Sequence, residues 1–197
     1  MKFKYDKATI AFIMLTTFCC ISTNAQQKTE TSHFSKFQAG AEVQWYPAGW
    51  LIGPVANYLI TPKHIINFRA AVNIINRHNW SGLNDDERGT GYGGSVGYRF
   101  LLNPSKSTLF LGARVDLFNT RIKWKNDIGT PQQSSGSTAT IVLQPSVESG
   151  YWIKLKKSKW NLLFAGGIGE EINIKTKGKE VGQGGLWLLS CSLLRSI

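Results

Sequence analysis

Charged residues that interrupt apolar segments are the first candidates for chemistry in this chain. In the segment FLGARVDLF, Arg114 and Asp116 stand two positions apart among apolar residues. Successive side chains of an extended strand point to opposite faces, so the two charges share one face and Leu111, Val115 and Leu117 share the other. A soluble barrel buries its aliphatic face. A membrane barrel turns that face to lipid and keeps the charged pair inside.

The same alternation recurs along the chain and places further polar residues on the charged face. An unpaired charge in a confined interior is costly, so arginines and acids on this face are expected to pair. The predicted inner polar network is Glu42, Arg69, Arg99, Arg114, Asp116, Gln144 and Glu148, with Glu171 as a further candidate. Eight strands close too tightly for an open pore, so the network is predicted to plug the barrel rather than conduct.

Alternation of apolar and polar residues predicts eight strands, with no convincing helical periodicity. The predicted strands are 37–46, 50–60, 64–75, 90–102, 107–125, 138–155, 159–174 and 184–195. If the chain starts on the inner side, the links on that side are all short. Three links on the other side are longer, which is typical of bacterial outer-membrane barrels. The predicted outer loops are 76–89, 126–137 and 175–183.

The first residues have the pattern of a secretory signal. Residues 1–25 run from a basic start through an apolar stretch to small residues before the predicted cut. Residues 26–36 are a short polar lead, and 37–197 form the predicted barrel domain. Beyond residue 25, 20 Lys+Arg stand against 11 Asp+Glu. Cys191 is the only cysteine in that part of the chain, so no intrachain disulfide is expected there.

Strand number, alternation and two segments carry a resemblance to a known group. The segments GYRF at 97–100 and LQPSVESGY at 143–151 resemble strands of small outer-membrane β-barrel proteins of Gram-negative bacteria, of the OmpA/OmpX type. The resemblance implies an all-β, eight-stranded antiparallel up-and-down transmembrane β-barrel in the cell outer membrane. It implies outer-membrane lipids and the barrel assembly machinery as partners. Such chains often end in an aromatic residue, whereas this one ends in LLRSI.

Basic and acidic clusters near the strand ends are candidate binding sites. Lipopolysaccharide phosphates are candidate partners for basic residues on the outer side, and ordinary solubilising charge is an equally supported interpretation. The residues concerned are Lys123, Lys125, Lys175, Lys177 and Lys179. The acidic segment NDDER at 84–88 lacks the spacing of a calcium loop, and is predicted to be a solvated loop.

The sequence shows no arrangement that predicts catalysis. None of His33, His64 and His78 is expected beside an acid on the inner face, so no nucleophile–base pair is visible. No Gly-rich phosphate loop or metal-ligand spacing is present, so no enzyme activity, cofactor or metal is predicted. The net charge of +11 raises nucleic acid as a partner, but export and the absence of a basic–aromatic motif argue against it.

The sequence therefore predicts a monomeric outer-membrane barrel with a structural, adhesion or surface-interaction role. Two alternatives remain open at this point. One is a narrow channel for small solutes, based on the glycine-rich charged face. The other is a soluble, secreted, lipocalin-like barrel that binds an apolar ligand.

Overall fold

The computed structural model describes residues 35–78, 83–155 and 158–197. The predicted signal peptide at 1–25 and most of the polar lead at 26–36 lie outside the described residues. Within the described residues, the regular elements are eight β-strands. No helix in this part of the chain is long and apolar enough to cross a membrane.

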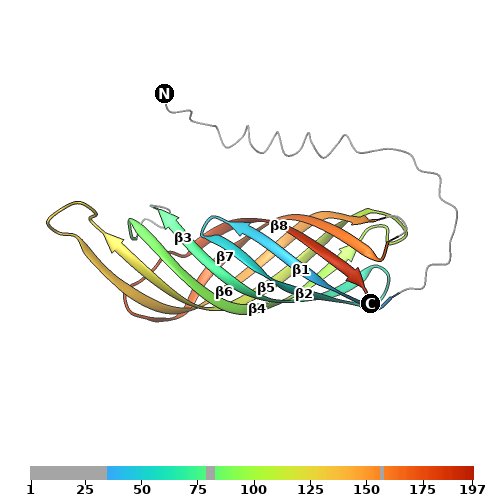
Figure 1. The fold of residues 1–197 in the computed structure, drawn as a ribbon, viewed down its shortest axis with the longest axis horizontal. Coiled ribbons are helices and arrows are strands. Elements are labelled where there is room, and N and C mark those ends of the chain that lie inside the picture. The colour runs from blue at the N-terminus through green and yellow to red at the C-terminus, as the bar shows by residue number, and fades with distance from the viewer. Residues whose placement is uncertain (1–34, 79–82, 156–157) are drawn as a thin grey trace, which may run out of the picture. The chain divides into compact units, whose positions relative to one another are not determined.

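The eight strands form one closed antiparallel barrel (Figure 1). Each strand pairs with its neighbours in sequence, and β1 also pairs with β8, so no strand edge is left open. The strands are β1 (Phe37–Tyr46), β2 (Gly49–Leu59), β3 (His64–His78), β4 (Asp86–Leu101), β5 (Thr108–Asn126), β6 (Ser134–Lys154), β7 (Trp160–Lys177) and β8 (Gly184–Ser196). The end of the barrel where β1 begins and β8 ends is called the terminal end, and the opposite end is called the loop end.

The predicted all-β class, strand number and strand order are confirmed, but the strands extend further at the loop end than predicted. Strand β3 continues to His78, β4 begins at Asp86, β6 begins at Ser134 and β7 continues to Lys177. In this region polar residues occupy both faces, so the alternation that identifies a strand is lost although backbone pairing continues. The loop-end links are therefore 47–48, 79–85, 127–133 and 178–183. In Figure 1 the yellow β5–β6 hairpin projects farthest at this end.

The aliphatic face of the sheet points outward. Phe68, Val96, Leu111 and Val147 are between 50% and 58% exposed on the outside of the barrel. Charged side chains lie inside instead, and Arg114 is 2% exposed. An outer surface of this kind suits lipid, and a lipocalin-like barrel with an apolar interior is the opposite arrangement. This arrangement does not support the soluble, lipocalin-like alternative.

Apolar and charged layers alternate inside the barrel. Along β5 the inward side chains include, in order from the terminal end, Phe110, the Arg114–Asp116 pair, Phe118 and Ile122. Phe110, Phe118 and Ile122 belong to three separate apolar clusters. Apolar layers thus lie on both sides of the charged residues, and together these layers fill the interior with packed side chains.

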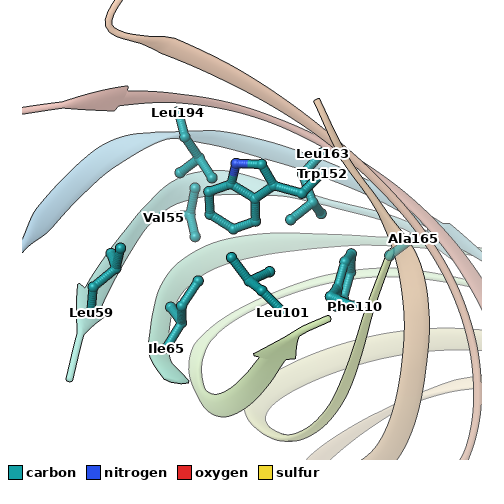
Figure 2. Close-up of a cluster of buried hydrophobic side chains, with 9 residues drawn as sticks. All are labelled: Val55, Leu59, Ile65, Leu101, Phe110, Trp152, Leu163, Ala165 and Leu194. Atoms are coloured by element: carbon teal, nitrogen blue, oxygen red, sulfur yellow. The ribbon is translucent and has the colours of Figure 1, made fainter. Parts of the chain in front are cut away.

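The apolar layer at the terminal end is built around Trp152, which is 1% exposed (Figure 2). Its indole Nε1 donates a hydrogen bond to Asn161 Oδ1 at 3.2 Å, so the ring's polar edge is satisfied inside the barrel. Phe110 fills the neighbouring space because Gly150 has no side chain. A Cβ at Gly150 would lie 2.6 Å from Phe110 Cε1. This layer closes the terminal end.

Candidate functional site

The central polar layer contains three arginines and three acids. The structure brings together six of the seven residues predicted for the inner network. They are Glu42, Arg69, Arg99, Arg114, Asp116 and Glu148. Their side chains are at most 2% exposed, and the charges balance. They come from β1, β3, β4, β5 and β6, so this layer joins strands around the barrel.

Glu42 is the centre of this layer. Its Oε1 accepts hydrogen bonds from Arg69 Nη1 at 2.7 Å and from Arg114 Nη1 at 2.9 Å. Its Oε2 accepts from the Ser192 hydroxyl at 2.8 Å and lies 3.5 Å from Arg99 Nη2. One carboxylate thus faces three guanidinium groups, and removing it would leave those positive charges without their shared partner.

The other two acids, Asp116 and Glu148, bind nitrogen atoms of Arg69 and Arg99 that do not contact Glu42. Asp116 Oδ1 accepts from Arg69 Nη2 at 2.5 Å, and Glu148 Oε1 accepts from Arg99 Nε at 2.6 Å. The Arg99 guanidinium also lies 5.4 Å from the centre of the Phe110 ring, in cation–π contact with the terminal apolar layer. The charged and apolar layers are therefore in direct contact, with no gap between them at this point.

Two neutral partners in this layer were not predicted. Gln44 Oε1 accepts from Arg69 Nη1 at 2.8 Å and also from Arg114, and Ser192 bonds Glu42. Gln44 follows Glu42 on the same face of β1, so the alternation already marked it as inward. Ser192 lies opposite Glu42 in the β1–β8 pairing. That register closes the barrel and could not be obtained from a single strand's pattern.

The seventh predicted residue, Gln144, lies in a second polar cluster nearer the loop end. Its Nε2 donates to Glu171 Oε2 at 2.9 Å, and Arg77 Nη2 donates to Glu171 Oε1 at 2.7 Å. Arg77 Nε also lies 3.5 Å from Glu87 Oε2. Arg77 and Glu87 were assigned to an outer loop from sequence, because the predicted strand stopped at residue 75. The strands continue, so both side chains point into the barrel.

Residues 178–183, which link β7 to β8, close the loop end. Arg77 Nη1 donates to the Gly182 carbonyl at 2.8 Å, and the Gly182 N–H donates to Glu87 Oε1 at 3.0 Å. Val181 is 1% exposed and packs with Ile75 and Ile122. This segment is called the cap. It places the Val181 side chain across the opening and is hydrogen-bonded there to the Arg77–Glu87 pair.

Arg77 is expected to hold the cap down. In Arg77→Gln the charge-assisted bond to Gly182 is lost, and the buried Glu171 loses the guanidinium that lies 2.7 Å from its Oε1. A bond of this type contributes about 1.5–3 kcal/mol, so local opening of the cap should rise roughly tenfold or more. Trypsin cleavage of the folded protein next to Lys177 or Lys179 measures this opening. Arg88→Gln, which removes an exposed arginine paired with Asp86, is the control and should leave the cleavage rate unchanged.

The space left inside the loop end is small. A recess of about 30 Å³ opens between the β1–β2 turn and the start of β8, with Arg77 and Glu171 in its wall. This volume holds roughly one water molecule. Among the described residues, no group of three or more His, Cys, Asp and Glu side chains is placed to hold a metal ion.

The acidic segment at 84–88 is not the solvated loop that was predicted. Asp86 begins β4, and Glu87 is 1% exposed inside the barrel. Asn84 Nδ2 donates to Glu87 Oε1 at 2.7 Å. The sequence pattern failed here because extension of β3 to His78 brings basic partners opposite these acids, with His78 Nδ1 2.8 Å from Asp86 Oδ1.

The remaining predicted candidates that the structure describes lie at the surface. His64 Nδ1 is 2.5 Å from the Tyr98 hydroxyl at the terminal end, and His33 lies outside the described residues. Four of the five predicted outer lysines are exposed on the loop-end parts of β5 and β7, namely Lys123, Lys125, Lys175 and Lys177. Lys179 instead belongs to the cap, where its Nζ lies 4.7 Å from the centre of the Trp124 ring.

Comparison with known proteins gives a likeness of fold. No family model matches the chain, and no curated protein matches it. The N-terminal β-barrel domain of Pseudomonas aeruginosa OprF is 12% identical with a TM-score of 0.40, and the match covers 80% of this chain and 96% of that one. Neisserial surface protein A (NspA) is 15% identical with a TM-score of 0.49, and the match covers 82% of this chain and 96% of that one.

The geometry of the chain itself defines its class. It is an all-β, closed, eight-stranded antiparallel barrel with charges inside and aliphatic side chains outside. This is the architecture of a small, OmpA-type outer-membrane barrel.

Proposed function

We propose that this protein is a sealed outer-membrane barrel that acts as a structural scaffold and contacts its surroundings through its outer surface and loop end. The observation that carries the proposal is the filled interior. An apolar layer around Trp152, the charged layer around Glu42 and the cap at 178–183 each cross the barrel. Because the interior is filled, the protein contacts other molecules through its outer surface and its loop end.

Outer-membrane localisation is part of this proposal. It is supported by the outward apolar face, whose side chains would be in contact with water in a soluble protein, and by the signal-like pattern at 1–25. Insertion by the barrel assembly machinery and a monomeric state are further parts of it. The loop end would then face the cell exterior, with links 79–85, 127–133 and 178–183 displayed there.

The narrow channel has less support than the scaffold. A conducting path would have to cross three buried apolar layers and a layer in which each charge faces an opposite charge. Several glycines of the inner face do not leave an open path, because neighbouring side chains approach them. A Cβ at Gly93, for example, would lie 2.7 Å from Phe118 Cδ1. The proposed role is also non-catalytic, because each acid of the charged layer is bound to arginine.

Conductance of the purified protein in planar lipid bilayers tests the proposal. We expect no current above that of the lipid alone, because no continuous water path crosses the packed layers. The inserted protein must be shown to be folded, by a band that stays compact on a gel until the sample is boiled. Stepwise conductance from folded protein would overturn the scaffold proposal and favour the channel.

A further inference from the structure

A row of unpaired cations lies on the outside of the barrel at the loop end. Arg121, Lys123 and Lys125 alternate along β5 with inward residues, so all three point outward, and each is exposed. Lys175 and Lys177 are exposed on β7. These five residues are called the basic row. Lys179 is not part of it because it packs on Trp124 in the cap.

The strand register brings the basic row together on one side of the barrel. Ala139 of β6 is paired with Arg121 of β5 on one side and with Lys177 of β7 on the other. One step away, Ile141 is paired with Lys175. Neighbouring strands are about 4.8 Å apart, so cations that flank β6 are separated by roughly 10 Å. The cations therefore lie on both sides of β6, whose outward residues between them, Ala139 and Ile141, are small or apolar.

Acids do not neutralise this row. In the described part of the chain, none of its five residues forms a salt bridge, in contrast to Arg88, whose Nε lies 3.2 Å from Asp86 Oδ2. Asp86 is also the residue paired with Lys125 across the β4–β5 ladder, but it is already bound to Arg88 and His78. The basic row thus carries five positive charges available to an external anion.

Apolar surface lies below the cations, beyond the outward-facing Asn119 of β5 and Glu170 of β7. Leu117 of β5 is 48% exposed and Ile168 of β7 is 65% exposed, and both face outward. A bulge in the β6–β7 ladder leaves Ile174 unpaired and 53% exposed beside Lys175. A ligand that covers this surface must have an anionic head and an apolar body in contact with the same strands.

We propose that the basic row binds the phosphate groups of a phosphorylated glycolipid of the outer leaflet, whose acyl chains lie on the apolar face of β5–β7. Ammonium and guanidinium groups are good partners for phosphate, and each contributes near a membrane surface. A free polyanion would satisfy the cations but leave the adjoining apolar surface uncovered. This inference rests on the proposed outer-membrane location and identifies the lipid that contacts the loop-end half of β5–β7.

Native mass spectrometry of the detergent-solubilised full chain tests the inference, with bisphosphorylated lipid A as the probe. The variant Arg121→Gln, Lys123→Gln, Lys175→Gln and Lys177→Gln removes four charges from exposed positions. Each cation near an anionic surface contributes roughly fivefold in affinity, so we expect the affinity of the variant for lipid A to fall by roughly a hundredfold or more. A band that stays compact until boiled shows that the variant is folded.

A matched control removes cations at the opposite end of the barrel. Lys63, Lys106 and Lys159 are exposed at the terminal end, and their replacement by Gln should leave lipid A binding unchanged. Dephosphorylated lipid A should bind the parent weakly, and millimolar inorganic phosphate should compete little, because it lacks the apolar body.

Three outcomes would overturn the inference. They are unchanged binding in the basic-row variant, equal loss in the terminal-end control, and equal binding of dephosphorylated lipid A. Displacement by inorganic phosphate would also overturn the inference, because it would indicate a site for small anions rather than for a lipid. Failure here is distinguishable from failure of the scaffold. A non-conducting barrel without lipid A preference overturns only this inference, and a conducting barrel with that preference overturns only the scaffold.

Discussion

Replacing Glu42 with Ala is expected to destabilise the barrel by about 3–5 kcal/mol, the cost of removing one partner from a buried ion pair. Glu42 faces Arg69, Arg99 and Arg114 with both carboxylate oxygens, and its side chain is fully buried. Without it, three guanidinium groups share the interior with only Asp116 and Glu148. Water cannot readily solvate the excess charge, because apolar layers lie on both sides of the network.

Urea unfolding of the protein in lipid vesicles measures this effect as a change in the free energy of unfolding. A second variant tests whether charge imbalance is the cause. Replacing both Glu42 and Arg69 by Gln restores the balance, so its cost should be well below the sum of the two single substitutions. If Glu42→Ala unfolds at the same urea concentration as the parent, water or an ion reaches the network and the interior is not sealed.

The sequence allowed the two faces of the barrel to be predicted because the side-chain period of a strand is two. A single strand such as β5 was enough to place Arg114 and Asp116 on the face opposite Leu111 and Val115, and the structure has this arrangement. Confinement of charge to one face, over several strands, indicated a polar interior. These features depend only on neighbours along the chain.

Partner choice inside the barrel depends on register, which the sequence pattern does not contain. Gln144 and Glu148 are on the same face of β6, yet Gln144 bonds Glu171 whereas Glu148 bonds Arg99. On that face only Ser146 separates them, and Gln144 is paired with Asp116 of the charged layer, so position along the strand does not decide the partner. A prediction that groups inward polar residues into one network cannot make this division.

The loop end was the least predictable part of the fold. Its strands continue past the apolar band, where neither lipid nor an apolar core imposes alternation, and the backbone ladder alone extends them. The cap depends on contacts between distant segments, such as Arg77 with Gly182, for which a single sequence contains no signal. Arg121 was missed for the same reason, since its outward neighbours on β6 and β7 become visible only with the register.

A lysine on the aliphatic face tests the membrane interpretation most directly. Val115 is 44% exposed on the outside of β5, between Val96 of β4 and Pro145 of β6. In Val115→Lys the ammonium would be placed in the apolar part of the bilayer. We expect a loss of about 2–4 kcal/mol in the free energy of unfolding from phosphatidylcholine vesicles, the cost measured for lysine near the bilayer midplane.

Thr90→Lys is the control for this substitution. Thr90 is also exposed on the outside of the barrel, but it lies in the loop-end part of β4, paired with Arg121. There the lysine stays in contact with water and headgroups, and the cost should fall to about 0–1 kcal/mol. In a soluble barrel both substitutions would add a surface lysine and change stability by about 0.5 kcal/mol or less. Equal, small effects would therefore exclude lipid contact at Val115, whereas a large difference between the two positions follows only if the aliphatic face is embedded.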